Sequence, residues 1–437
     1  MNEPGVIQYL RMYLHSPQGD RVPIGVVSQY GETMRMSFNE DYIEDPQRLT
    51  LSMQFQGADD AQTRAILQSK RDVRLVRNDG HWPSYLQNLL PEGHNRDRLA
   101  MERGCDNADE FQLLAAAGHD LTGALEVEPY PASEEIPKEV RHWHTAMGLD
   151  VLEPGFVEMP VEDAFAIPGI VTKFSAIKDG RRYVVKRHGA AGSHIIKLPT
   201  TTHPDLALNE FVGYMLCSDL ELDCAHAELM TPAEVDLPEQ VDFSTVLVVE
   251  RFDREPGRRV HMEEFAQAMA IAPNKKYGTN LITDYGRMLR LINERSIQPA
   301  QDVAEFLGRL VAFILMGNTD AHLKNWALLY EDGIHPSLAP LYDPVCVSSF
   351  FAGVDERTYA QNRAIDKTLR AFDWDAFRHL ITVAGLQRGP RLIAKCREYV
   401  AQAQARWPAI MNGFPTPVAV KQEIMERLQG KVAIAAS

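Results

Sequence analysis

Three side chains in the C-terminal half of the chain have the types and the order that phosphoryl transfer requires. Asp320 and Asn325 lie in one polar stretch, and Asp343 follows after a short apolar run. Phosphoryl transfer needs a base that orients the attacking hydroxyl and oxygen ligands that hold Mg²⁺ against the nucleotide phosphates. Asp320 suits the base, whereas Asn325 and Asp343 suit the metal.

The surroundings of this triplet matter, because an Asp followed five residues later by an Asn arises by chance in most chains of this length. The pair follows an apolar helix predicted over Phe306–Met316, and Gly317 is a helix stop. Asp343 ends a strand-like run from residue 338. The pattern predicts a tight polar loop between a helix and a strand. The alternative is a solvated turn whose Asp and Asn cap the helix.

A nucleotide site also needs a strand lysine that contacts the α- and β-phosphates. Lys197 lies in the apolar run Ile195–Pro199, where a buried lysine would need a partner. Glu210, in a predicted helix, is either that partner or a surface residue. The alternative for Lys197 is a solvated strand face.

Two backbone segments complete the candidate nucleotide site. The turn Pro168–Lys173 contains Gly169, and its N–H groups could contact phosphates, although a lone glycine more often marks an ordinary turn. The segment Val249–Arg254 closes a strand-rich part of the chain, where backbone groups between two lobes would meet an adenine edge. The alternative there is a salt-bridged strand end.

The bulk composition describes an ordinary globular protein of two to three structural units. The chain has 437 residues, 45% hydrophobic and 24% charged. Its net charge of −15 argues against direct binding to nucleic acid, which needs clustered Lys and Arg. Five scattered cysteines without CxxC spacing indicate neither a disulfide framework nor a zinc site. With no targeting segment and no apolar run long enough to span a membrane, we expect a cytoplasmic protein.

The elements expected along the chain form an α+β fold of two lobes preceded by an N-terminal subdomain. Residues 1–130 read as a small β-sheet plus helices, and a Pro- and Glu-rich connecting segment follows over 131–165. Residues 166–255 read as a β-rich nucleotide-binding lobe with one helix at 209–219. Residues 256–437 read as a helical lobe, with helices expected at 262–270, 284–297, 302–316, 374–384, 390–407 and 418–431. This is the order of a bilobal protein-kinase-like fold.

Several motifs together resemble the HipA-type serine/threonine kinases, the toxin halves of bacterial toxin–antitoxin pairs. The likeness covers nearly the whole chain and rests on the following segments: Leu89–Gly93, Arg96–Ala100, Leu113–Gly118, Gly123–Leu125, Gly169–Ser175, Ser193–Pro199, Asn209–Phe211, Val249–Arg254, Asp320–His322 with Asn325, and Leu341–Asp343.

The resemblance implies a role for each matching residue. Asp320 would be the catalytic base, and Asn325 and Asp343 would bind Mg²⁺. The residues implied to bind ATP are Pro168, Gly169, Ile170, Val171, Thr172, Lys173, Lys197, Glu250, Arg251, Phe252, His322, Leu323, Lys324, Asn325, Tyr342 and Asp343.

The resemblance also implies an activity and a partner. The family phosphorylates protein serine or threonine, and its best-known substrates are aminoacyl-tRNA synthetases, notably the glutamyl enzyme, which stops translation and growth. Its usual partner is a small helix-turn-helix antitoxin of the HipB type, so that DNA is contacted only through the antitoxin.

Two positions depart from the family pattern. Ala166 or Pro168 stands where the family often has an autophosphorylated serine, and Val171 replaces a common glutamine. Self-inactivation through the usual residue is therefore not expected. Two other functions share these motifs: a small-molecule phosphotransferase, and a weakly catalytic kinase fold that acts as corepressor with a DNA-binding antitoxin.

Overall fold

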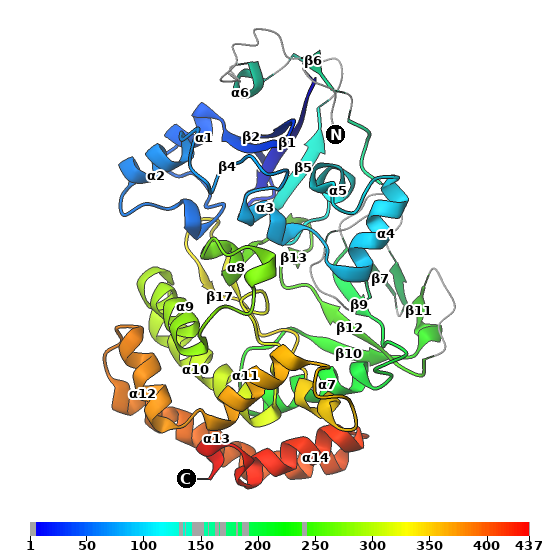
Figure 1. Cartoon of the computed structure of the whole chain (residues 1–437), viewed down its shortest axis with the longest axis vertical. Helices are drawn as coiled ribbons and strands as arrows, with labels where there is room; N and C mark the ends of the chain where they lie inside the picture. Colours follow the sequence, from blue (N-terminus) through cyan, green and yellow to red (C-terminus); the bar gives the residue numbers. More distant parts are fainter. Residues whose placement is uncertain are drawn as a thin grey trace.

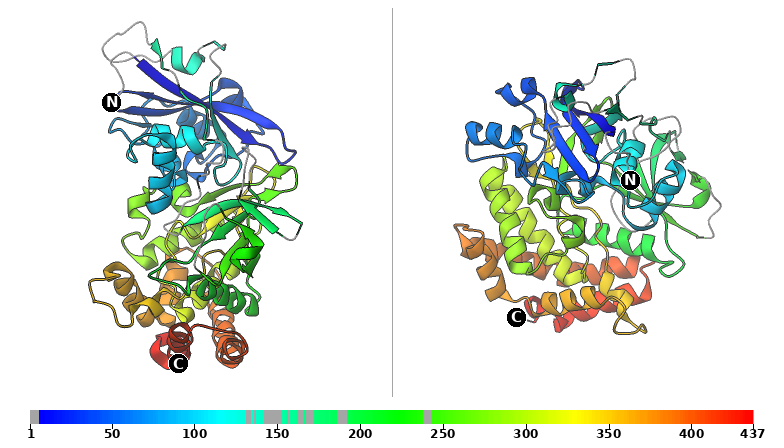
Figure 2. Two further views of the ribbon diagram at one scale, coloured as in Figure 1. Left: turned by 90° about the vertical axis from the view of Figure 1, so that its right-hand side faces the viewer. Right: turned by 45° about the horizontal axis from the view of Figure 1, so that its top comes forward.

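The computed structural model places an N-terminal unit above a second sheet and a helical lobe (Figure 1). It describes residues 6–130, 134–135, 137–141, 153–155, 157–161, 166, 172–180, 182–185, 192–237 and 243–436. The side view shows the two sheets one above the other, with the C-terminal helices below them (Figure 2). None of the helices within these ranges combines the length and the apolar character needed to cross a membrane.

The N-terminal unit is built on an antiparallel sheet in the order β4-β3-β2-β1-β5, with β6 paired in parallel to β1. Side chains alternate between the two faces of a strand, and in β1 this alternation buries Leu10, Met12 and Leu14 against the helices. Its elements are β1 (Val6–His15), β2 (Arg21–Tyr30), β3 (Thr33–Phe38), α1 (Glu40–Glu44), η1 (Met53–Phe55), α2 (Asp60–Leu67), β4 (Val76–Arg77), α3 (Ser84–Leu89), α4 (Gly93–Arg103), α5 (Glu110–Ala117), β5 (Leu125–Pro129), α6 (Lys138–Arg141) and β6 (Glu153–Pro154).

The second sheet has the order β10-β12-β9-β7-β8-β11 and carries one long helix. In this sheet Lys173 of β7 is the direct cross-strand partner of Lys197 of β9, so both side chains emerge on the same face. The elements are β7 (Lys173–Asp179), β8 (Arg182–Val185), β9 (His194–Lys197), α7 (Leu206–Asp219), β10 (Ala227–Met230), η2 (Pro232–Glu234), β11 (Val235–Asp236) and β12 (Val246–Glu250).

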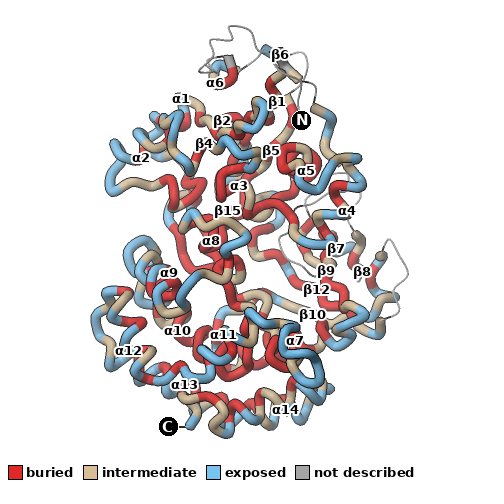
Figure 3. The backbone as a smooth tube through the Cα atoms, viewed as in Figure 1, coloured by how far each residue is buried: buried red, intermediate tan, exposed pale blue. Residues whose placement is uncertain are grey.

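The helical lobe packs around α10, in which every residue from Phe306 to Met316 is buried. Burial is continuous through the middle of the molecule, while α12 and α14 present exposed residues outward (Figure 3). The elements are β13 (Arg254–Glu255), β14 (Arg258–Arg259), β15 (His261–Glu264), α8 (Phe265–Ala268), η3 (Pro273–Lys275), α9 (Leu281–Arg295), α10 (Pro299–Met316), β16 (Ala327–Tyr330), β17 (Ser337–Leu338), η4 (Val347–Phe351), α11 (Ala360–Ala371), α12 (Trp374–Val383), α13 (Gly389–Gly413), α14 (Val418–Glu426), η5 (Arg427–Lys431) and η6 (Ala433–Ala435).

The α+β class is confirmed, and most expected strands and helices are present with shifted ends. The helix expected over 262–270 is wrong at its start, because His261–Glu264 forms strand β15 paired with β16, and only Phe265–Ala268 is helical. The hydrophobic periodicity of a short apolar run does not distinguish a strand from a helix. Which of the two forms therefore depends on the segment with which the run pairs. The domain borders at 130, 165 and 255 stay predictions.

A buried carboxylate joins the N-terminal unit to the rest of the molecule. Asp120 is fully buried, and its Oδ1 lies 3.0 Å from Arg251 Nη1 and 3.2 Å from Arg254 Nη2. Its Oδ2 accepts a hydrogen bond of 3.0 Å from the Ser175 hydroxyl of β7. One side chain of the N-terminal unit therefore contacts both the nucleotide-lobe sheet and the segment that follows β12.

Replacing this carboxylate should be costly, because two buried guanidinium groups would then share Asp253 as their remaining carboxylate partner. Asp120→Asn is expected to lower the free energy of unfolding by roughly 3 kcal/mol, measured by urea denaturation. Asp375→Asn is the matched control, since Asp375 pairs with Arg378 on the exposed surface of α12. That change should cost no more than about 0.5 kcal/mol. Equal effects of the two changes would contradict a joining role for Asp120.

Candidate active site

The polar loop between α10 and β16 folds tightly around Asp320. α10 ends at Gly317, whose φ of 76° is the left-handed conformation that favours glycine. The side chain of Asn318 accepts the N–H of Asp320 at 3.1 Å. The Asp320 carbonyl accepts the N–H of His322 and the side-chain amide of Asn325, both at 2.7 Å. The structure thus has the expected tight loop, with Asn325 held against the backbone of Asp320.

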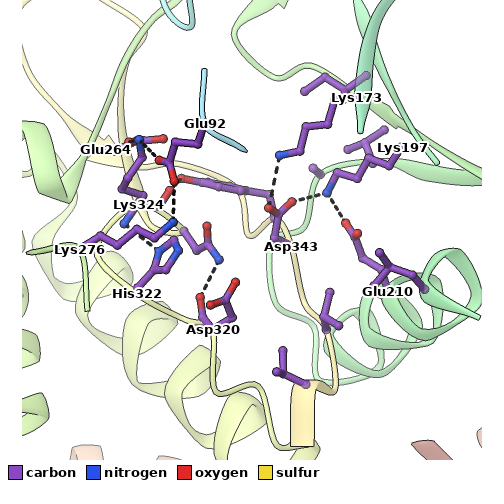
Figure 4. A pocket seen from close by; sticks show the side chains of 18 of the residues that line it. Glu92, Lys173, Lys197, Glu210, Glu264, Lys276, Asp320, His322, Lys324 and Asp343 are labelled. Atoms are coloured by element: carbon purple, nitrogen blue, oxygen red, sulfur yellow. Dashed lines mark hydrogen bonds and ion pairs between the residues drawn. The ribbon is translucent and has the colours of Figure 1, made fainter. Parts of the chain in front are cut away.

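Asp343 lies between two lysines that come from neighbouring strands. Its φ of 56° is a left-handed conformation, which Asp adopts more readily than most residues. Oδ1 accepts a hydrogen bond from Lys197 Nζ, and Oδ2 lies 3.8 Å from Lys173 Nζ. Lys197 Nζ also donates to Glu210 Oε1 at 2.5 Å, so Glu210 is the buried partner of Lys197 (Figure 4).

These ion pairs fix the charge of the buried groups. Burial opposes the charge on Lys197, but the carboxylates of Asp343 and Glu210 outweigh it and raise the lysine pKa above its usual value. Burial would likewise raise the pKa of Asp343, but Lys197 and Lys173 hold it well below the usual range. Burial lowers the pKa of Lys173, and Asp343 offsets this only in part. Asp343 is therefore ionised at neutral pH.

The cleft beside these residues is a cavity of about 440 Å³, large enough for a nucleotide. Ile195, Val249 and Met262 give it apolar walls that suit a flat base. Of the residues expected to form the site, those that line the cavity are the proposed base Asp320 and the expected nucleotide-binding residues Lys173, Lys197, Glu250, Arg251, Phe252, His322, Lys324, Asn325, Tyr342 and Asp343.

Two of the remaining expected residues, Leu323 and Thr172, do not line the cavity. Leu323 is buried in the hydrophobic core of the helical lobe, so its side chain does not border the cavity. Thr172 is not among the lining residues, and its carbonyl accepts the N–H of Leu198 at 3.1 Å. Pro168, Gly169, Ile170 and Val171 lie outside the described residues.

The segment after β12 uses some of the groups expected to meet the adenine. The N–H of Glu250 donates to the carbonyl of His226 at 2.8 Å, and that of Arg251 donates to Ser193 at 2.9 Å. The guanidinium of Arg251 is buried against Asp120 and Asp253. Arg251 therefore fits the alternative expected for this segment, a salt-bridged strand end. An adenine base at this edge would have to contact other backbone groups.

The N-terminal unit contributes a second carboxylate to the site, which the sequence did not predict. Glu92 Oε1 lies 2.7 Å from Lys324 Nζ, and its Oε2 lies 2.7 Å from Lys276 Nζ (Figure 4). Lys324 Nζ also donates to the carbonyl of Asn88 at 3.0 Å and lies 3.6 Å from Glu264. The lysine next to Asn325 is thus tied to a different part of the chain.

Burial and neighbouring charges tune the groups in this cluster. Burial would raise the pKa of Glu92, but Lys324 and Lys276 lower it to about 2. Burial raises the pKa of Glu264 to about 7, because Lys324 compensates only in part and Glu92 adds to the rise. Burial lowers the pKa of His322 to about 4, so this imidazole is neutral near pH 7.

A second contact that the sequence did not predict involves Tyr277, whose hydroxyl donates to Asp320 Oδ1 at 2.6 Å. Tyr277 lies in the turn before α9, far from Asp320 in the chain. The local sequence around Tyr277 does not indicate that its hydroxyl contacts Asp320.

The donor set of the cleft fits a small hard cation. Among the described residues no three His, Cys, Asp or Glu side chains gather into a metal site. Mg²⁺, however, usually takes one or two protein oxygens and completes its shell with phosphate oxygens and water. The Asp343 carboxylate and the Asn325 amide oxygen are donors of that kind.

The raised pKa of Glu264 makes a pH-dependent contribution to stability. Folded Glu264 keeps its proton up to about pH 7, whereas the unfolded side chain loses it near 4.5, so this contribution is lost as pH rises through that window. Glu264→Gln stays neutral. Its stability relative to wild type should therefore increase by up to about 3 kcal/mol between about pH 5 and about pH 8, measured by urea denaturation. A difference independent of pH would contradict this assignment.

Comparisons with known proteins agree with this geometry. The HipA-like C-terminal domain family matches residues 165–407, and the HipA N-terminal domain family matches residues 19–128. The chain is 33% identical over 403 residues to the Sinorhizobium fredii protein named "Putative kinase Y4dM", with 91% of each chain covered. It is 26% identical over 292 residues to the serine/threonine-protein kinase toxin HipA of Shewanella oneidensis, covering 61% of this chain and 63% of that protein.

A solved structure supports the same relationship at the level of the fold. The chain matches the Shewanella oneidensis toxin–antitoxin complex of HipA, HipB and operator DNA with a TM-score of 0.64 and 19% identity, over 96% of both chains. The expected kinase-like bilobal α+β fold is confirmed. The chain therefore belongs to the HipA family of kinase-like proteins.

Proposed function

We propose that this chain is an ATP- and Mg²⁺-dependent serine/threonine protein kinase and the toxin of a toxin–antitoxin pair. One observation carries the proposal: Asp320 and Asn325 share one tight loop, and they line the same cavity as Asp343 and the Lys197–Glu210 ion pair. This is the set of groups that phosphoryl transfer needs.

Each of these residues has a distinct task in the proposed reaction. Asp320 accepts the proton of the substrate hydroxyl as its oxygen forms a bond to the γ-phosphorus, while the bond from that phosphorus to the leaving β-phosphate oxygen breaks. Lys197, held by Glu210, binds the nucleotide phosphates. Asn325 and Asp343 hold Mg²⁺, which supplies positive charge for the transferred group. Asp343 is already ionised, so it can ligate a cation without first losing a proton.

The substrate and the partner are proposed from the family. An aminoacyl-tRNA synthetase, of the glutamyl type first, is the substrate to test. The related Shewanella oneidensis structure contains HipB and operator DNA. We therefore propose a HipB-type helix-turn-helix antitoxin as the partner, with DNA contacted through it, because a net charge of −15 disfavours direct binding. Free cysteines are consistent with a cytoplasmic location.

The proposed base can be removed with almost no change of shape. Asp320→Asn should reduce phosphate transfer from γ-labelled ATP to protein in a cell extract by at least about 100-fold, because the amide cannot accept the proton. Asp375→Asn, on the exposed surface of α12, is the control and should label protein as wild type does.

The outcomes separate the proposed kinase from its alternatives. Undiminished labelling by Asp320→Asn would overturn the role of Asp320. Label only in a low-mass fraction would instead favour a small-molecule phosphotransferase. A nucleotide-dependent thermal shift without turnover would favour a corepressor. Phosphoproteomics after brief induction, wild type against Asp320→Asn, would identify the protein substrate.

The departure at Ala166 leads to a separate expectation. Ala166 is buried, its N–H donates to the Asp120 carbonyl at 3.2 Å, and it has no hydroxyl to modify. Intact-mass and peptide analysis of purified wild-type protein should find no stoichiometric phosphate in residues 161–180. A fully phosphorylated peptide from this region would show that another hydroxyl, such as that of Thr172 or Ser175, replaces the usual serine.

A further inference from the structure

The proposed catalytic base is already hydrogen-bonded to a side chain from another part of the chain. The Tyr277 hydroxyl donates to Asp320 Oδ1 at 2.6 Å, and both residues line the cavity. A base must keep one carboxylate oxygen directed at the substrate hydroxyl, within about 3 Å. A free carboxylate rotates about its terminal torsion, so a donor fixed on one oxygen determines where the other points.

The turn that carries Tyr277 is held in place at several points. Lys276 pairs with Glu92, and its carbonyl accepts the N–H of Leu323 at 3.0 Å. Asp284 Oδ2 accepts the N–H groups of Thr279 at 2.9 Å and of Asn280 at 3.1 Å. The turn is thus anchored to the N-terminal unit, to the catalytic loop and to α9, so the phenol is positioned before any substrate binds.

The ring of Tyr277 has partners of its own. It packs edge-on against His322, with centroids 5.0 Å apart, and Lys276 Nζ lies 5.8 Å from the ring centroid. Asn362 of α11 lines the same cavity, and its amide donates to the Thr319 carbonyl at 3.3 Å. The cavity beside Tyr277 is therefore bounded by α11 as well.

The hydroxyl acts as a donor and not as a base. Burial, together with the charge of Asp320, raises the pKa of Tyr277 far above its usual value, so the phenol keeps its proton throughout the physiological range. The other titratable groups near the pair are His322, Lys276, Lys324 and Glu92.

We propose that Tyr277 is a positioning residue that holds Asp320 Oδ1, so that Oδ2 is presented to the acceptor hydroxyl of the substrate. This inference rests on the proposed role of Asp320 as the base.

Tyr277→Phe tests the inference, because it removes only the hydroxyl and keeps the ring against His322. The kcat for protein phosphorylation should fall on the order of 10-fold, while the KM for ATP stays unchanged. A merely structural role would leave the surroundings of the Asp320 carboxyl group unchanged, which a spectroscopic measurement can detect.

A second measurement does not depend on turnover. In protein carrying ¹³C-labelled aspartate carboxyls, the Asp320 signal is assigned by its loss in Asp320→Asn. Tyr277→Phe should change the chemical shift of this signal, because the carboxylate loses the hydrogen bond that the phenol donates. Absence of phosphotransfer by wild type would defeat the proposed function, whereas an unchanged Asp320 carboxyl signal in Tyr277→Phe would defeat the inference by itself.

Tyr42→Phe is the matched control. It removes a hydrogen bond of the same length, 2.6 Å from the Tyr42 hydroxyl to the Leu49 carbonyl, in the N-terminal unit and away from the cavity. It should change neither kcat nor the carboxyl signal of Asp320. Unchanged kcat together with an unchanged Asp320 signal in Tyr277→Phe would overturn the inference. So would increased phosphorylation, which would mean that Tyr277 blocks the acceptor position, or stoichiometric phosphate on Tyr277 itself.

Discussion

The structure depends on two carboxylates of the N-terminal unit, each of which binds two cations of the kinase part. Asp120 pairs with Arg251 and Arg254, and Glu92 pairs with Lys276 and Lys324. A buried cation without a counter-charge is strongly unfavourable, so these pairs form only when the N-terminal unit is docked. The N-terminal unit therefore helps to position the loop that carries Asp320 and Asn325 relative to the second sheet. It does so although it contains none of the three residues proposed for phosphoryl transfer.

This docking also shapes the electrostatics of the cleft. Glu92 and Asn88 of the N-terminal unit contact the buried Lys324, and charge interactions strengthen in buried surroundings. Glu92 stays ionised because it has two lysine partners, whereas Glu264 has one distant partner and its pKa rises to about 7. Two neighbouring glutamates thus have pKa values on opposite sides of the usual one, because their partners differ.

The sequence predicted the parts of the site that depend on local order, and it missed those that depend on docking. The loop of Asp320 and Asn325 follows from a helix stop and polar spacing, and Lys197 follows from a charge in an apolar strand. Nothing in the local sequence indicates the site contacts of Glu92 and Tyr277, since the partner of each lies in a different part of the chain. The residues of strand β15 are predicted to be helical for the same reason, because only their pairing with β16 shows that they form a strand. The contribution of Pro168–Val171 stays a prediction.

The balance of charge around Asp343 indicates how the cleft can accept a nucleotide. The carboxyl groups of Asp343 and Glu210 and the amino groups of Lys173 and Lys197 form a chain of ion-pair contacts. A lysine that left the half-buried Asp343 for a phosphate would deprive that carboxylate of counter-charge unless another cation took its place. Under the proposed roles, a nucleotide that arrives with a divalent cation would meet both needs, since the cation would pair with Asp343 while the released ammonium binds phosphate. Nucleotide and metal should therefore bind cooperatively here, because neither alone leaves every charge in this cluster paired.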